Sequence, residues 1–283
     1  ELRRLGVIRK PVMVVPKHLV EQTAAEALTL YPAAKVLVAG KKDFEKDRRK
    51  QLFAKIATGD WDLIIMAHSS FERIPMPESM ITDFFNEQLE KIEEAILREK
   101  ELGQRRTVTV KNLEQAKKRL EAQMKKALES LRERQDVGFM TFDELGIDGL
   151  FLDEAHYYKN LFFTSRMNNV AGLGNKEGAQ RTFDLFMKVK YLQRLNGGRG
   201  LVFATATPVS NSMAELYTMM RYLAPDILEE YGLSNFDLWA NTFGEVITVL
   251  EMAPAGGGYR PSNKFAKFIN LPEVLSMFRE LAD

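Results

Sequence analysis

The chain has 283 residues, enough to bury the core of one large domain or of a domain that carries an insertion. Its 40 basic and 39 acidic residues give a net charge of +1, which excludes binding to nucleic acid through a global basic excess and leaves only local contacts. The lack of cysteine excludes disulfides and thiol nucleophiles, and the lack of a long apolar run excludes a membrane span, so a cytoplasmic protein without membrane contact is expected.

The N-terminal part alternates between strand and helix patterns. Residues 11–16 form a short apolar run bounded by prolines, which predicts a buried strand, and two more strands are predicted over 35–39 and 62–67. Apolar residues at helical spacing predict helices between them, over 17–30 and 44–57. This alternation predicts parallel strands with right-handed helical crossovers, and therefore an α/β fold.

Residues 78–136 differ, because they are rich in Glu, Lys, Arg, Gln and Leu and carry no strand signal. Two apolar stripes predict an antiparallel helical hairpin of coiled-coil character inserted into the α/β domain, with Thr109 or Asn112 as the N-cap of its second helix. The stripes are Ile81, Phe85, Leu89, Ile92 and Ile96, then Leu113, Leu120, Met124, Ala127 or Leu128, and Leu131.

The hairpin is either a solvated structural insertion or a binding surface for nucleic acid or a partner protein. The basic residues of such a surface would be Arg105, Arg106, Lys117, Lys118 and Arg119. Glutamates alternate with the basic residues, which argues against a phosphate-binding stripe.

Residues 149–156 read Gly-Leu-Phe-Leu-Asp-Glu-Ala-His, an apolar strand that ends in two carboxylates. Acids that follow a buried strand lie at the carboxyl edge of a sheet, where open α/β folds bind ligands. Asp153 could hold a magnesium ion while Glu154 orients or deprotonates a water molecule. The alternative is a strand end whose acids are only solvated.

The rest of the chain returns to an α/β pattern. Residues 157–180 are rich in Asn and Gly and predict a long loop. A helix over 182–195 and a strand over 201–204 lead into the run Thr-Ala-Thr-Pro at 205–208. Further helices are predicted over 213–223, 236–251 and 272–281, with a turn or flexible loop at 253–261. The predicted α/β domain is in two parts, residues 1–77 and 137–226. The inserted hairpin is predicted over 78–136, and a helical C-terminal extension over 227–283.

Several of these stretches resemble motifs of Swi/Snf-like superfamily-two helicases. Residues 14–20 look like motif Ia and residues 64–72 occupy the place of motif Ib. The Asp-Glu-Ala-His box matches motif II, and residues 205–211, followed by Glu215-Leu216-Tyr217, resemble motif III. The likeness is greatest to large helicase proteins of bacterial plasmids and phages, which are often fused to DNA methylase regions. It covers most of the chain except the hairpin and implies a RecA-like motor domain, with a parallel sheet flanked by helices.

One motif of this family has no counterpart in the chain. The family holds ATP phosphates with Gly-x-x-x-x-Gly-Lys-Ser/Thr, and neither Gly40-Lys41-Lys42 nor residues 171–178 have that spacing. The resemblance therefore implies a fragment of a longer motor, with the phosphate loop upstream and a second RecA-like domain downstream. ATP and Mg²⁺ would be the cofactors of the complete motor, and the fragment would be inactive alone.

The resemblance also assigns roles to the residues around the nucleotide. Asp153 would bind the magnesium ion, usually through water, and Glu154 would orient the attacking water, so both would serve as cofactor-binding and catalytic residues. His156 would contact motif III, and Thr205 and Thr207 would link the ATP site to the DNA track. The alternatives are a histidine satisfied in the core and threonines that cap a helix before Pro208.

Candidate contacts to nucleic acid follow three of the motifs. A helix start offers backbone N–H groups and a side-chain cation to a phosphate. The candidates are Lys17 and His18 after the first strand, His68, Ser69 and Ser70 after the third strand, and Asn211 in motif III. Lower in rank are Lys159, Lys176 and Arg181, and also Phe162 and Phe163, which could stack on a base but read more simply as core residues.

Taken together, these features favour an ATP-driven DNA helicase or translocase, with double-stranded DNA as its track and a second RecA-like domain as its partner, joined in some relatives by a methylase region. A non-catalytic nucleic-acid-binding or interaction module, built around the hairpin, is the first alternative, and an RNA helicase is the second. A metal hydrolase that uses Asp153, Glu154 and His156 lacks further evident ligands, because the three histidines show no metal-ligand spacing.

Overall fold

The computed structural model describes residues 2–101, 108–134, 140–165, 167, 170–171, 178–210, 212, 214–252 and 259–282. The chain divides into two compact units. The first consists of Glu1–Glu154 and Asp184–Ala204, and the second of Ala155–Phe183 and Thr205–Asp283. Among the described residues, no helix combines the length and the apolar character that a membrane span requires.

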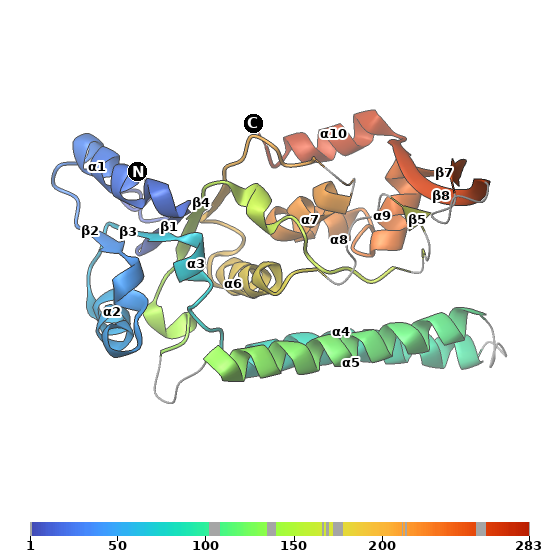
Figure 1. Cartoon of the computed structure of the whole chain (residues 1–283), viewed down its shortest axis with the longest axis horizontal. Coiled ribbons are helices and arrows are strands. Elements are labelled where there is room, and N and C mark those ends of the chain that lie inside the picture. The colour runs from blue at the N-terminus through green and yellow to red at the C-terminus, as the bar shows by residue number, and fades with distance from the viewer. Residues whose placement is uncertain are drawn as a thin grey trace. The chain divides into compact units, whose positions relative to one another are not determined.

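The first unit is built on a five-stranded parallel sheet with the strand order β2-β3-β1-β4-β6 (Figure 1). Its strands are β1 (Pro11–Val15), β2 (Val36–Ala39), β3 (Leu63–Ala67), β4 (Gly149–Leu152) and β6 (Leu201–Phe203). The three central strands are almost entirely apolar and buried, as expected for parallel strands that are covered on both faces. β6 forms one end of the sheet, and its residue Val202 is 43% exposed.

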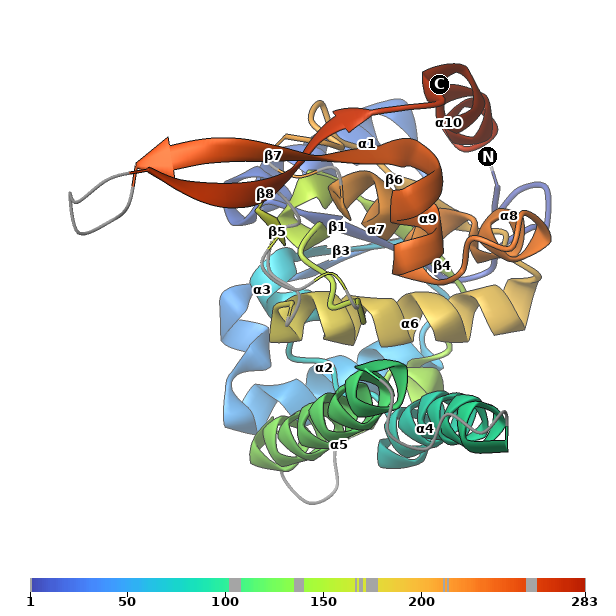
Figure 2. The same cartoon turned by 90° about the vertical axis from the view of Figure 1, so that its right-hand side faces the viewer.

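Helices cover both faces of this sheet. Helix α1 (Val20–Leu30) lies on one face, while α2 (Lys46–Thr58) and the part of α6 (Gln180–Asn196) that follows Asp184 lie on the other (Figures 1 and 2). The short helix α3 (His68–Phe71) follows β3 directly. Short 3-10 helices precede α1, α2 and β4, at Lys17–Leu19, Lys41–Phe44 and Asp143–Leu145. The predicted α/β fold is confirmed: a five-stranded parallel sheet is flanked by helices, consistent with a RecA-like domain.

The predicted helical hairpin is also confirmed. Helices α4 (Glu78–Glu101) and α5 (Val108–Arg134) run side by side in opposite directions (Figures 1 and 2). The buried apolar residues of the hairpin are Ile81, Phe85 and Ile96 on α4 and Val110, Leu120, Ala127 and Leu131 on α5. The prediction of Thr109 or Asn112 as an N-cap is wrong. Both lie inside α5, because the buried stripe already begins at Val110 and the helix extends to include it.

Charged residues of the hairpin pair with each other across the two helices. Lys117 Nζ lies 2.6 Å from Glu93 Oε1, and this hydrogen bond raises the pKa of the lysine. Arg132 pairs with Glu78 at 2.9 Å. Lys118 and Arg119 are exposed, and Arg105 and Arg106 lie outside the described residues. Lys117 is therefore engaged within the hairpin rather than displayed for a phosphate.

The second unit combines helices with a small sheet. Its helices are α7 (Ala214–Leu223), α8 (Pro225–Glu230), α9 (Phe236–Phe243) and α10 (Leu271–Arg279). The sheet has the order β5-β8-β7, in which β7 (Gly244–Met252) and β8 (Tyr259–Phe268) form a long antiparallel ribbon and β5 (Val170–Ala171) adds two residues (Figure 2). The predicted loop over 157–180 thus contains this short strand, as well as the end of a 3-10 helix, Ala155–Tyr158.

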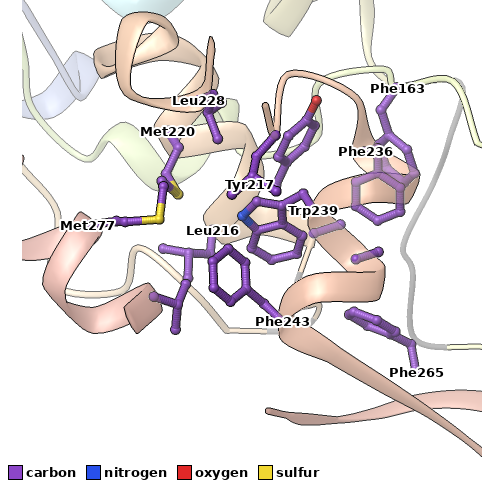
Figure 3. Close-up of a cluster of buried hydrophobic side chains, with 14 residues drawn as sticks. Phe163, Leu216, Tyr217, Met220, Leu228, Phe236, Trp239, Phe243, Phe265 and Met277 are labelled. Atoms are coloured by element: carbon purple, nitrogen blue, oxygen red, sulfur yellow. The ribbon is translucent and has the colours of Figure 1, made fainter. Parts of the chain in front are cut away.

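An aromatic cluster forms the core of this unit (Figure 3). Trp239 is fully buried and packs against Phe236, Tyr217 and Phe243, with ring centroids 5.5 to 6.1 Å apart. Residues from α7, α8, α9, β8 and α10 all contribute to the cluster. Because large aromatic side chains dominate core energetics, this cluster holds the helices to the β-ribbon.

The prediction of one helix over 236–251 is wrong after Phe243. Helix α9 ends there and β7 begins at Gly244, where a Cβ atom would lie 1.9 Å from the ring of Phe265. Only glycine therefore allows β8 to pack this closely. The run Val-Ile-Thr-Val at 246–249 is β-branched and favours a strand, a signal that the helical spacing of the same residues conceals. Of the turn predicted at 253–261, residues 253–258 lie outside the described residues and 259–261 already belong to β8.

Candidate functional site

The five parallel strands of the first unit end at one edge of the sheet, and the predicted site residues follow three of them. Lys17 follows β1, Ser69 follows β3 and Asp153 follows β4, and β1 lies between the other two strands. Because the carboxyl ends of parallel strands share an edge, the topology brings the residues that follow β1 and β3 to the same edge as the two acids in this unit. Such an edge is where open α/β sheets bind ligands.

Backbone hydrogen bonds continue the sheet up to the first acid. The Asp153 N–H donates to the Val14 carbonyl oxygen at 2.9 Å, and the Ala204 N–H donates to the Leu152 carbonyl oxygen at 2.8 Å. The first of these bonds fixes the backbone of Asp153 against β1. The side chains of Asp153 and Glu154 are both partly exposed, so a ligand can reach them.

Glu154 has an unusual backbone. Its φ is +51°, in the left-handed region that a non-glycine residue seldom adopts. This conformation costs about 1–2 kcal/mol, and such residues gather at functional sites, where the surrounding structure enforces them. The turn it creates ends β4 and leads the chain into the 3-10 helix Ala155–Tyr158.

In the second unit, the histidine of the acidic box contacts the Thr-Ala-Thr-Pro run. His156 Nδ1 lies 3.3 Å from Thr205 Oγ1, and the same hydroxyl oxygen accepts a hydrogen bond from the Thr207 N–H at 3.1 Å. His156 is partly exposed, so it is not a core histidine. The capping alternative for the threonines is wrong, because no helix begins at Pro208 and α7 begins only at Ala214.

A nearly buried ion pair lies close by in the same unit, and the sequence did not reveal it. Lys159 Nζ lies 3.3 Å from Glu215 Oε1, and the two side chains are only 12% and 4% exposed. Glu215 Oε2 accepts a hydrogen bond from the Ser210 N–H at 2.7 Å, and Lys159 Nζ donates to the Ser210 hydroxyl oxygen. Lys159 is a lower-ranked candidate for contact with nucleic acid, but its ammonium group is committed to this internal network.

The candidates for nucleic-acid contact in the first unit differ in exposure. Lys17 and His18 are exposed on the 3-10 helix that follows β1. Ser69 is exposed on α3, whereas His68 and Ser70 are buried, with exposed fractions of 8% and 5%. Ser69 is therefore the side chain of the three that a phosphate can reach. Asn211 lies outside the described residues.

Most of the lower-ranked candidates for contact with nucleic acid are engaged in contacts within the second unit. Arg181 Nε donates to the Tyr157 carbonyl oxygen at 3.2 Å, and its guanidinium lies 4.1 Å from the centre of the Tyr157 ring. Phe162 and Phe163 are each 8% exposed, and the Phe163 ring packs 4.1 Å from that of Phe236. The interpretation of these phenylalanines as core residues is confirmed. Lys176 lies outside the described part of the chain.

A buried lysine anchors α3 within the first unit. Lys188 on α6 is 0% exposed, and its Nζ lies 2.5 Å from Asp184 Oδ2 and donates to the Phe71 carbonyl oxygen at 2.8 Å. The ammonium also lies 4.3 Å from the centre of the Phe71 ring. Because Phe71 is the last residue of α3, this contact holds the helix that carries Ser69.

The acids at the sheet edge fit a magnesium ion that is shared with a nucleotide. In the described ranges, no three histidine, aspartate or glutamate side chains converge as a metal-binding cluster. Magnesium bound with ATP needs no such cluster, because one or two carboxylates, water and the phosphates complete its shell. A partly exposed carboxylate such as that of Asp153 meets this requirement.

Comparison with known proteins gives two matches. A family model described as a probable helicase domain matches residues 1–283. A segment of 106 residues, 37% of this chain, is 34% identical to the defense against restriction protein B of Escherichia phage P1. That segment makes up 5% of the phage protein, so the chain spans only a small part of the length of this relative. No solved structure matches the chain at a comparable significance.

Proposed function

Because the chain belongs to the family of probable helicase domains, we propose that it is the first RecA-like motor domain of an ATP-driven DNA helicase or translocase. The observation that carries the proposal is the placement of Asp153 and Glu154 at the carboxyl edge of the parallel sheet, beside β1, the strand proposed to carry motif Ia. The family match supports a helicase-related function, and the two acids at this edge support hydrolysis of ATP as its reaction.

Each acid has a separate role in this proposal. Asp153 holds magnesium, which neutralises phosphate charge when it is bound with ATP. Glu154 orients the attacking water and takes its proton, the task of a general base. Its left-handed backbone supports this role, because strain is tolerated where the orientation of a catalytic side chain requires it.

The phosphates of ATP need a further element. No Gly-x-x-x-x-Gly-Lys-Ser/Thr sequence occurs in the 283 residues, and a motor of this kind requires one. We therefore propose that the natural protein supplies the phosphate loop and a second RecA-like domain from other segments. This chain alone would then turn over little or no ATP.

Contacts to the DNA track are proposed along the same edge of the sheet. The exposed Lys17 and His18 begin the helical segment after β1, where backbone N–H groups and a cation can meet a phosphate. Ser69 offers a hydroxyl after β3. Contacts of this kind position a protein on the backbone without reading sequence, as a translocating motor requires.

Hydrolysis of ATP with and without DNA tests the proposal. The intact natural protein is expected to hydrolyse ATP slowly alone and faster with double-stranded DNA, and the 283-residue chain is expected to show little turnover under either condition. RNA of matched length serves as the control for the RNA-helicase alternative. If the intact protein shows no ATP turnover with any nucleic acid, the motor proposal fails.

Removal of the hairpin separates the motor from a non-catalytic binding module built around α4 and α5. The Arg132–Glu78 ion pair shows that the two ends of the hairpin are adjacent, so a short Gly-Ser linker can replace residues 78–134. The shortened intact protein is expected to retain DNA-stimulated ATP turnover, because the sheet edge is left in place. If it loses DNA binding and turnover together while it remains folded by circular dichroism, the binding-module alternative is favoured.

A further inference from the structure

We infer that Lys159 and Glu215 are positioning residues that fasten the Thr205–Ser210 loop to the segment behind the acidic box, and that this fastening makes ATP turnover respond to DNA. The inference rests on the proposed function and goes beyond it, because it assigns a role to two residues that the proposal uses neither for ATP nor for DNA. It begins from the ion pair between these residues in the second unit.

The loop is held at both of its ends by the same segment. At its start, Thr205 contacts His156, and at its end, Ser210 contacts Lys159 through its hydroxyl and Glu215 through its N–H. His156 and Lys159 are three residues apart on and just after the 3-10 helix Ala155–Tyr158. A shift of this helix therefore moves both ends of the loop.

The 3-10 helix Ala155–Tyr158 directly follows the two acids that are proposed to act in ATP hydrolysis. Glu154, the second of these acids, precedes the helix in the chain without an intervening residue and has a left-handed backbone. The Tyr222 hydroxyl donates to the Tyr158 carbonyl oxygen at 3.2 Å and to the Thr182 carbonyl oxygen at 3.0 Å, which ties the end of the helix to α7 and α6. The segment thus moves as one piece with its neighbours in this unit.

Burial strengthens the attachment at Ser210, which is made through the Lys159–Glu215 ion pair. Glu215 is 3% exposed and opens the first turn of α7, where the helix dipole favours a negative charge. Lys159 supplies the opposite charge. Removal of either residue would leave the charge of the other buried without compensation. By contrast, the contact of His156 with Thr205 is partly exposed and joins a ring nitrogen to a neutral hydroxyl group. The ion pair is therefore the firmer of the two attachments.

The test measures ATP turnover of the intact protein with and without saturating double-stranded DNA. Lys159→Met and Glu215→Gln are each expected to lower the stimulation by DNA about tenfold, within the range of typical coupling between two sites. Turnover without DNA is expected to stay unchanged, because the proposal gives neither residue a role in holding magnesium or the attacking water. The double variant is expected to behave like either single variant, and Lys159→Arg, which keeps the cation, is expected to restore most of the stimulation.

Lys267→Met is the matched control. Lys267 pairs with Glu245 at 4.0 Å in the same unit, but the two side chains are 67% and 48% exposed. Removal of this lysine is expected to leave ATP turnover unchanged both with and without DNA, since exposed ion pairs contribute little to stability. A general loss of folding would instead lower the rate without DNA in the Lys159 and Glu215 variants, and this result would overturn the inference.

Two further outcomes would also decide against it. If Lys159→Met weakens the affinity for DNA but leaves the stimulation at saturating DNA unchanged, Lys159 is a DNA contact and not a positioning residue. If the unaltered protein is not stimulated by DNA, the proposed function itself fails. Amide hydrogen exchange at Ser210 then still tests the fastening, because loss of the Glu215 acceptor in Glu215→Ala should speed exchange at that amide, and an unchanged rate contradicts it.

Discussion

Replacement of Glu154 by Gln in the intact protein is expected to lower DNA-stimulated ATP turnover by at least about 100-fold, the usual loss when a general base is removed. The amide keeps the size of the side chain and can still occupy the left-handed position, but it cannot accept a proton from the attacking water. Binding of ATP and of DNA should largely persist, because Asp153, the residue proposed to hold magnesium, is retained and the amide keeps the shape of the side chain. The measurement is steady-state turnover with saturating DNA, together with nucleotide binding by the same variant.

A companion variant, Glu154→Gly, separates catalysis from stability. Glycine adopts φ of +51° without steric cost, so the 283-residue chain should become more stable by about 1 kcal/mol in urea unfolding while the intact variant loses turnover as the glutamine variant does. Higher stability combined with lost activity is the signature of a residue kept for its function. DNA-stimulated turnover that survives in Glu154→Gln would show that Glu154 is not the base.

Replacement of Lys188 by Met is expected to lower the free energy of unfolding of the chain by about 3–5 kcal/mol, because it leaves the carboxylate of Asp184 buried without its charge partner. The lysine is fully buried and also donates to the carbonyl oxygen of Phe71. Urea unfolding measures the loss, and amide hydrogen exchange should quicken first at α3. The exposed Arg194 on the same helix provides the control Arg194→Met, expected to change stability by less than about 0.5 kcal/mol.

The double variant Lys188→Met with Asp184→Leu tests the cause. With both charges removed, most of the lost stability should return, and the remaining deficit of about 1–3 kcal/mol would reflect the unpaired carbonyl oxygen of Phe71. If the double variant is as unstable as the single variant, packing of the lysine stem rather than its charge is responsible.

The sheet of the first unit was predictable, whereas the β-ribbon and the buried ion pair of the second were not. Apolar runs such as residues 11–15 and 149–152 are short and bounded, so their strand character and their carboxyl ends could be read directly. The β7–β8 ribbon was missed because Val246 to Val249 satisfy both a helical and a strand pattern, and only the packing of Phe265 over Gly244 distinguishes them.

Two ion pairs, Lys159–Glu215 and Lys188–Asp184, could not be predicted because their burial depends on tertiary packing. Lys159 and Glu215 are 56 positions apart, and no local pattern joins a lysine after a 3-10 helix to a glutamate at the start of α7. Lys188 and Asp184 are four positions apart and read as an ordinary solvated pair on a helix, because their burial depends on α3 and its Phe71. The acidic box was recognisable because its chemistry lies in consecutive residues.

The end of the sheet at β6 has a practical consequence. A strand at the end of a sheet has a neighbouring strand on one side only, and here Val202 adds apolar surface to that edge. Such an edge is a template for a strand from another molecule, and no lysine or proline within Leu201–Phe203 blocks that pairing. The isolated chain should therefore tend to associate with itself as its concentration rises, and solution work on it is best carried out dilute.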